Sequence, residues 1–149
     1  MELVLFIGIP ATGKSSFYRE RFFRTHVRLN FDMLKSRHRA GLLLKACFEG
    51  KTKLVVDNTN LTREERASYI TPAKAAGFRV IGYFFRSRVG EALARNALRA
   101  PEERVPAAGI HGASGRLVLP SYEEGFERLY FVRMNEPQGF LVEDWKPDR

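Results

Sequence analysis

The chain has 149 residues, of which 44% are hydrophobic, and it carries a net charge of +8. This length predicts one domain over residues 1–149 with a sizeable core, and no apolar run approaches the ~20 residues of a membrane span. The start Met1-Glu2 lacks the basic segment of a secretory signal, and the single cysteine, Cys47, excludes an intrachain disulfide. We therefore expect a cytoplasmic protein without membrane contact, in which Cys47 fills the core and the basic charge favours polyanionic partners.

The first elements in chain order are a strand, a glycine-rich loop and a helix. Residues 3–7 form an unbroken apolar run, as expected of a strand buried on both faces, and residues 16–24 have a helical pattern. Between them, residues 8–15 read G-x-x-x-x-G-K-S, the pattern of a phosphate-binding loop (P-loop) when a strand and a helix flank it.

This loop predicts a site for a nucleoside triphosphate. Backbone N–H groups and the start of the helix attract phosphate, Lys14 adds a full positive charge, and the Ser15 hydroxyl is suited to ligate Mg²⁺. The residues expected to hold the nucleotide here are Gly8, Pro10, Ala11, Thr12, Gly13, Lys14, Ser15 and Ser16.

The rest of the chain alternates between strand and helix patterns. We expect strands at 26–30, 54–57, 78–85 and 129–133, and helices at 31–48, 62–76 and 86–99. Residues 106–125 predict a loop with one helix, and the tail from about 136 is expected to be irregular. The alternation predicts an α/β fold with a central parallel sheet flanked by helices, in which ligands bind at the carboxyl ends of the strands.

Two aspartates fall at those strand ends. Asp57 directly follows a buried strand, where an acid of the Walker-B type supports Mg²⁺, although Asp57-Asn58 also suits a turn. Asp32 can accept a hydrogen bond from an attacking hydroxyl, or cap a helix that begins at Met33, and the two roles are compatible.

A pair of arginines lies near the end of the helix expected at 86–99. Arg95 and Arg99 are four residues apart, which places both on one helix face. Such a pair can clamp the phosphates of a bound nucleotide, or can simply belong to a solvated basic face.

Together these segments resemble the polynucleotide 5′-kinase family of P-loop phosphotransferases, over roughly residues 3–132. The resemblance is carried by G-x-P-x-x-G-K-S at 8–15, Asn30-Phe31-Asp32, Asp57-Asn58-Thr59-Asn60, Arg95-Asn96-x-x-Arg99, Val105-Pro106 and Glu124-Gly125-Phe126. It implies a three-layer P-loop kinase-like fold with an arginine-bearing lid, and ATP and Mg²⁺ as donor and cofactor.

The resemblance also implies roles for particular residues. Asp32 falls on the family's general base, and Arg95 and Arg99 fall on the lid arginines that reach the donor phosphates. The acceptor would be bound by Asp32, Lys35, Asp57, Asn60 and Val105. Lys35 stands where the family commonly has an arginine, and it keeps the charge but loses the bidentate fork.

The leading hypothesis is therefore an enzyme that moves the γ-phosphate of ATP to a hydroxyl, most readily the 5′-OH end of DNA or RNA. Two alternatives remain open: a kinase of a small-molecule hydroxyl such as a nucleoside, sugar or antibiotic, and a non-catalytic nucleotide-binding module.

Overall fold

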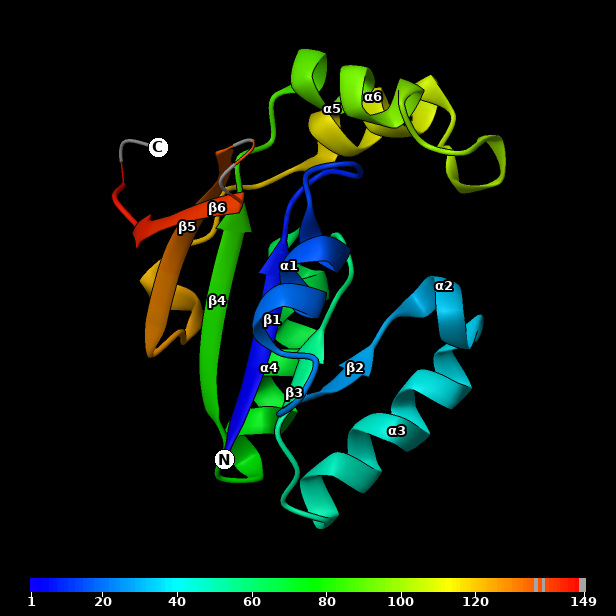
Figure 1. The fold of residues 1–149 in the computed structure, drawn as a ribbon. Helices are drawn as coiled ribbons and strands as arrows, with labels where there is room; N and C mark the ends of the chain where they lie inside the picture. The colour runs from blue at the N-terminus through cyan, green and yellow to red at the C-terminus, as the bar shows by residue number, and fades with distance from the viewer. Residues whose placement is uncertain (136, 138, 148–149) are drawn as a thin grey trace.

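The structure, a computed structural model, describes residues 1–135, 137 and 139–147. Within these residues one sheet has the strand order β2-β3-β1-β4-β5-β6 (Figure 1). Neighbouring strands are parallel except β5 and β6, which are antiparallel. The strands are β1 (Glu2–Ile7), β2 (Val27–Leu29), β3 (Leu54–Val56), β4 (Arg79–Phe85), β5 (Arg128–Asn135) and β6 (Gly139–Asp144).

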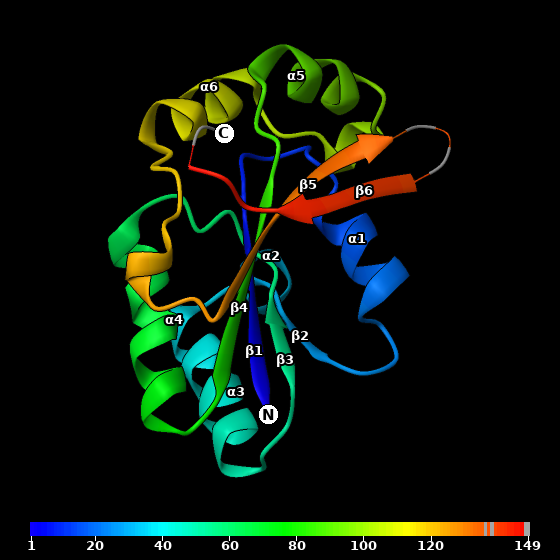
Figure 2. The same ribbon diagram turned by 90° about the vertical axis from the view of Figure 1, so that its left-hand side faces the viewer.

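Helices cover both faces of the sheet and the carboxyl ends of its strands. They are α1 (Lys14–Arg21), α2 (Phe31–Leu34), α3 (Arg37–Glu49), α4 (Arg63–Ala75), α5 (Val89–Ala97) and α6 (Ala107–Arg116), with short 3₁₀ turns η1 (Pro101–Glu103) and η2 (Tyr122–Glu124). Figure 2 shows α1 on one side of the sheet, α3 and α4 on the other, and α5 and α6 across the strand ends. No helix in the described part of the chain is long and apolar enough to cross the lipid bilayer.

The central strand β1 is buried on both faces, as its unbroken apolar sequence predicts. Leu3, Leu5 and Ile7 belong to the core under α3 and α4, whereas Val4 and Phe6 pack with the aromatic residues of α1. Because alternate residues of a strand point to opposite faces, only a continuous apolar run can fill both cores. The expected core role of Cys47, on α3, is also confirmed.

The single helix expected at 31–48 is wrong: the structure divides it into α2 and α3. Lys35 adopts a left-handed conformation with φ of 63°, which ends α2. The side chain of Ser36 then accepts a hydrogen bond from the N–H of Arg39 and caps α3. Serine is a preferred N-cap, so its hydroxyl favours a new helix start at this point. The first helix likewise begins at Lys14 and ends at Arg21, earlier than expected.

The tail, expected to be irregular, instead contains β6. This strand pairs with β5 from Tyr130 opposite Asp144 to Asn135 opposite Gly139. Trp145 follows this strand. Its backbone N–H donates to the carbonyl of Leu129, and its ring packs edge-on against that of Phe84 at 5.2 Å between ring centroids. Gly139 is thus the first residue of the strand, and the prolines at 137 and 147 lie outside it.

Helices α5 and α6 pack onto the glycine-rich loop through a small apolar cluster formed by Ile9, Ala11, Leu61, Ala92, Ile110 and Ala113. The connection between the two helices is fixed by the buried side chain of Asn96. Its amide donates to the carbonyl of Val105 at 2.6 Å and accepts from the Val105 N–H at 2.9 Å. These contacts hold Val105 over the carboxyl ends of the strands.

Candidate active site

The loop between β1 and α1 has the shape of an anion-binding site. Gly13 has φ of 94°, and a Cβ atom there would lie 2.9 Å from the Phe140 ring, so glycine is required for both conformation and space. Lys14 is buried and donates from Nζ to the carbonyls of Gly8 at 2.9 Å and Ile9 at 2.6 Å. Its ammonium group therefore lies within the curve of the loop.

Burial has a large electrostatic effect on this lysine. The pKa of Lys14 is lowered from 10.5 to about 7, chiefly by desolvation on burial; Asp57 acts to raise the pKa, and Arg99 adds to the lowering. Removal from water disfavours the charged form of an amine, so a bound anion would restore the positive charge.

Beside the lysine, Ser15, Asp57 and Arg28 form one polar cluster. The Ser15 hydroxyl donates to Asp57 Oδ2 at 3.2 Å, as expected if the two share a metal. Arg28, from the middle of β2, donates from Nε to the same oxygen at 2.8 Å and from Nη2 to Ser15 Oγ at 3.1 Å. Asp57 is only 2% exposed, so its charge depends on neighbouring protein groups, of which Arg28 bonds to it directly and Lys14 interacts with it electrostatically.

Two asparagines join the loops that follow β2 and β3. Asn30 donates to the carbonyl of Asp57 at 2.7 Å and accepts from the N–H of Met33 at 2.9 Å, and Asn58 accepts from the N–H of Phe31 at 2.8 Å. The expected capping role of Asp32 is therefore wrong: Asn30 caps α2, and Asp32 is an exposed residue in its first turn.

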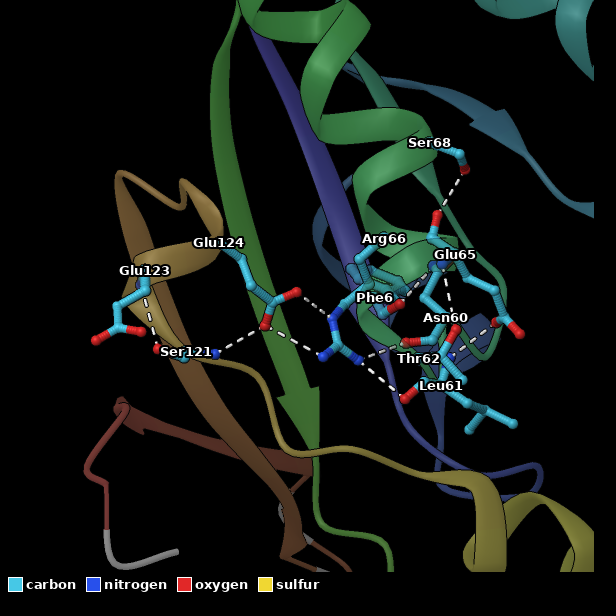
Figure 3. A network of polar contacts seen from close by, with 10 residues as sticks. All are labelled: Phe6, Asn60, Leu61, Thr62, Glu65, Arg66, Ser68, Ser121, Glu123 and Glu124. Carbon is cyan, nitrogen blue, oxygen red and sulfur yellow. Dashed lines mark hydrogen bonds and ion pairs between the residues drawn. The ribbon is translucent and has the colours of Figure 1, made fainter.

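A buried arginine fixes the loop that follows β3 (Figure 3). Arg66, in α4, donates from Nη1 to the carbonyls of Asn60 and Leu61, both at 3.0 Å. Its other nitrogens pair with both oxygens of Glu124 at 2.7 and 3.1 Å. Asn60 has φ of 46° and donates to the carbonyl of Phe6 at 2.7 Å, so this network connects α4 and η2 to β1.

A cavity of about 940 Å³ brings most of the predicted site residues together. Those that line it are Pro10, Ala11, Lys14, Ser15, Asp32, Asp57, Asn60, Val105 and Arg99. Those that do not are Gly8, Thr12, Gly13, Ser16, Lys35 and Arg95. Lys35 instead forms the exposed turn between α2 and α3, and Arg37, two residues on, lines the cavity.

The expectation for the arginine pair is wrong in its geometry. Helix α5 ends at Ala97, so Arg99 lies beyond it and does not continue the face that carries Arg95. Its N–H bonds to the carbonyl of Asn96, and its own carbonyl accepts from Arg104 Nε. Arg99 is the one of the two that lines the cavity.

The far half of the cavity lies between α3 and α4. Arg37, Ala40, Gly41 and Leu44 line it from α3, and Glu64, Glu65, Ser68 and Tyr69 line it from α4. Each set repeats every three or four residues, so each belongs to one helix face. Burial raises the pKa of Tyr69 above its ordinary value. This half of the cavity thus combines a short apolar wall with polar side chains and with charged side chains of both signs.

The donor set fits a magnesium ion. A hydroxyl and a carboxylate oxygen are hard ligands, and the guanidinium of Arg28 already places positive charge between them. No group of three or more His, Cys, Asp or Glu side chains suited to a metal occurs among the described residues. Mg²⁺ commonly binds one or two protein ligands and completes its shell with water and phosphate.

Sequence reasoning missed Arg28, Arg37 and Arg66. A signal existed for Arg66, because it shares a face of α4 with the buried residues Ile70 and Ala73, at spacings of four and seven. A charged residue on such a face predicts a buried partner. The signal for a functional role of Arg28 was weaker: it is a charged residue in the middle of a short strand.

Comparisons with known proteins agree with this arrangement. A protein-family model described as an AAA domain matches residues 3–113. The bifunctional polynucleotide phosphatase/kinase of Schizosaccharomyces pombe is 28% identical over 137 residues, which cover 86% of this chain. The chain corresponds to only 32% of the length of that relative.

Solved structures share the fold at low sequence identity. Kti12 of Chaetomium thermophilum, in complex with ADP-AlF3, has a TM-score of 0.67 at 17% identity, covering 91% of this chain and 92% of its own. A gluconokinase of Sinorhizobium meliloti 1021 has a TM-score of 0.64 at 17% identity, covering 91% of this chain and 84% of its own. With the family model matching well over half of its residues, the chain belongs to this AAA-domain family and is a P-loop kinase-like nucleotide-binding domain.

Proposed function

We propose that the protein transfers the γ-phosphate of ATP to a hydroxyl group, and that its preferred acceptor is the 5′-OH end of DNA or RNA. One observation carries this proposal: donor-side residues Lys14 and Ser15 and acceptor-side residue Asp32 line the same cavity. A non-catalytic binding module would not need a carboxylate opposite its phosphate loop.

In this mechanism the residues mainly position the reactants and neutralise charge. Lys14 and the loop N–H groups bind the β- and γ-phosphates, and Asp32 accepts the proton of the attacking hydroxyl. The acceptor oxygen forms its bond to phosphorus as the bond to the β-phosphate oxygen breaks, and ADP leaves. Arg99 balances the charge on the transferred group, with Arg95 as the more distant member of the proposed lid. Mg²⁺, held by Ser15 and Asp57, would supply further neutralisation of the phosphates.

The polynucleotide acceptor is supported by the S. pombe relative, whose name includes that activity, and by the net charge of +8. The acceptor would lie between Asp32, Asn60 and Val105, with Arg37 taking the phosphate contact that was expected of Lys35. The direct test is transfer of labelled γ-phosphate to a 5′-OH oligonucleotide. An oligonucleotide that never accepts phosphate, beside a small hydroxyl compound that does, would reject this acceptor and keep the kinase.

A small-molecule hydroxyl is the second candidate, and the carboxylate of Glu64 in the cavity wall favours it, whereas that of Glu65 is already paired with Arg116. Carboxylates repel a phosphate backbone but bind the hydroxyl and amino groups of a sugar or nucleoside. Salt separates the two candidates: the KM for a polynucleotide should rise steeply with ionic strength, whereas the KM for a neutral acceptor should not.

The helix-interior glycine Gly41 provides a test of where the acceptor binds. A Cβ atom at Gly41 would meet no atom within 4 Å, and the same holds for Gly112 in α6, outside the cavity lining. Replacement of either by alanine should raise the free energy of unfolding by ~0.5–1 kcal/mol. Gly41→Leu should in addition raise the acceptor KM about tenfold or more, by filling the α3–α4 half of the cavity. Gly112→Leu is the matched control, and unchanged acceptor KM in both variants would move the acceptor elsewhere.

The lowered pKa of Lys14 predicts how nucleotide binding depends on pH. With a pKa of about 7 in the free protein, Lys14 loses its charge as pH rises above 7, and phosphate binding must then recover a proton. Affinity for ATP should therefore be greatest below pH 7 and fall by up to about tenfold per pH unit between pH 7.5 and 9.5. Calorimetry in buffers of different ionisation enthalpy would measure the proton uptake. Lys14→Met should bind weakly and without this slope, and a flat profile in the wild type would contradict the prediction.

A further inference from the structure

The most unusual contact in the site is that of Arg28 with the two residues proposed to hold the metal. Its guanidinium donates to Asp57 Oδ2 at 2.8 Å and to Ser15 Oγ at 3.1 Å, while these two oxygens lie 3.2 Å apart. A planar cation that donates to both oxygens uses lone pairs that a metal held by the same two residues would need.

We infer that Arg28 takes the place of the metal ion at Ser15 and Asp57 whenever no nucleotide is bound, so that the metal enters only together with the nucleotide. This inference rests on the metal role proposed for Ser15 and Asp57. It adds Arg28 as a residue that competes with the metal for Ser15 and Asp57 and so controls when the metal binds.

Burial explains why a substitute cation is needed. Asp57 is 2% exposed, and a buried carboxylate without a partner is costly, so a positive group must face it in every state. Lys14 contributes only through its charge, since its Nζ donates to the carbonyls of Gly8 and Ile9, whereas Arg28 bonds to the Asp57 carboxylate itself. Arg28 compensates the carboxylate in the free protein, and its two hydrogen bonds hold the side chains of Ser15 and Asp57 together.

The side chain also has a way to leave. It is 28% exposed, and it extends from β2, which is the edge strand of the sheet. Its guanidinium carbon already lies over the Tyr18 ring, 5.8 Å from the ring centre, and this cation–π contact does not depend on the bonds to Asp57 and Ser15. Tyr18 is itself fixed, since its hydroxyl donates to the carbonyl of His26 at 2.6 Å.

The test is Mn²⁺ binding in the absence of nucleotide, followed by electron paramagnetic resonance. The wild type should bind Mn²⁺ weakly, and Arg28→Met should bind it about tenfold or more tightly, because the competing cation is gone. Asp57→Asn added to Arg28→Met should abolish that gain. Arg21→Met, at an exposed arginine of α1 paired with Glu20, removes the same charge without touching the site and should behave as the wild type.

The outcomes separate this inference from the metal role. Equal nucleotide-free affinity in wild type, Arg28→Met and Arg21→Met overturns the inference, even if Mn²⁺ with ATP still binds through Asp57. If Asp57→Asn does not weaken the binding of Mn²⁺ in the presence of ATP, the metal role itself is overturned. Should Arg28→Met fail to fold, the wild type gives the answer by NMR. The Nε–H resonance of Arg28 should lose its protection from solvent exchange when Mg²⁺ and nucleotide are added together, and an unchanged resonance contradicts the inference.

Discussion

Asp32→Asn is expected to lower kcat for phosphoryl transfer by ~10²–10⁴ while leaving the affinity for ATP unchanged. The amide keeps the size of the side chain but accepts no proton. Asp32 is exposed in the first turn of α2 and lines the cavity, whereas the phosphate contacts come from the loop around Lys14. Single-turnover transfer of labelled phosphate, together with calorimetric titration of ATP, measures both quantities.

Asp144→Asn is the matched control for this experiment. Asp144 is an exposed aspartate at the end of β6, outside the cavity lining, and its replacement removes the same charge. The control should retain the wild-type kcat. A loss of less than about threefold in Asp32→Asn would remove Asp32 from the chemistry, and an equal loss in both variants would assign the effect to net charge.

Arg66→Met is expected to cost ~3–5 kcal/mol of unfolding free energy, the largest effect on stability that we predict. The Arg66 side chain is fully buried, and its replacement leaves Glu124, which is 5% exposed, without its bidentate partner. The carbonyls of Asn60 and Leu61 also lose their donor (Figure 3). Urea unfolding measures the loss, and the exposed pair Arg79–Glu127 supplies the control: Arg79→Met should leave the free energy of unfolding nearly unchanged, because solvent screens that pair.

A double variant separates the two contributions of Arg66. Arg66→Met with Glu124→Leu removes both charges, so the part of the cost due to an unpaired carboxylate should be recovered. The part due to the loop carbonyls should remain, because neither new side chain donates a hydrogen bond. Complete recovery would show that Arg66 does not support the loop at Asn60, and no recovery would show that the charge pair contributes little.

The parts of the fold that depend on local sequence were predictable. The phosphate-binding loop follows from its own residues, and α4 is capped by Thr62, whose side chain accepts from the Glu65 N–H as expected. Gly77, with φ of 80°, follows the end of that helix as predicted. In these places the residues that determine the structure are neighbours in the chain.

The missed features depend on partners that are distant in sequence. Arg28 contacts Asp57 only because β2 pairs with β3 in a register that sets Leu29 opposite Val56. β6 is a strand because β5 offers it an edge, and Trp145 is buried because Phe84 and Leu129 lie beneath it. The break at Lys35 had a local sign, Ser36, but the helical pattern of residues on both sides concealed it.

The contact of Gly13 with Phe140 makes the donor site depend on the opposite end of the sequence. The Phe140 ring and the Met134 side chain occupy the space behind Gly13, so the hairpin of β5 and β6 supports the back of the phosphate-binding loop. A truncation that removes β6 would therefore weaken ATP binding even where the parallel strands still assemble. The carboxyl-terminal segment is thus a structural part of the nucleotide pocket rather than an appendage to it.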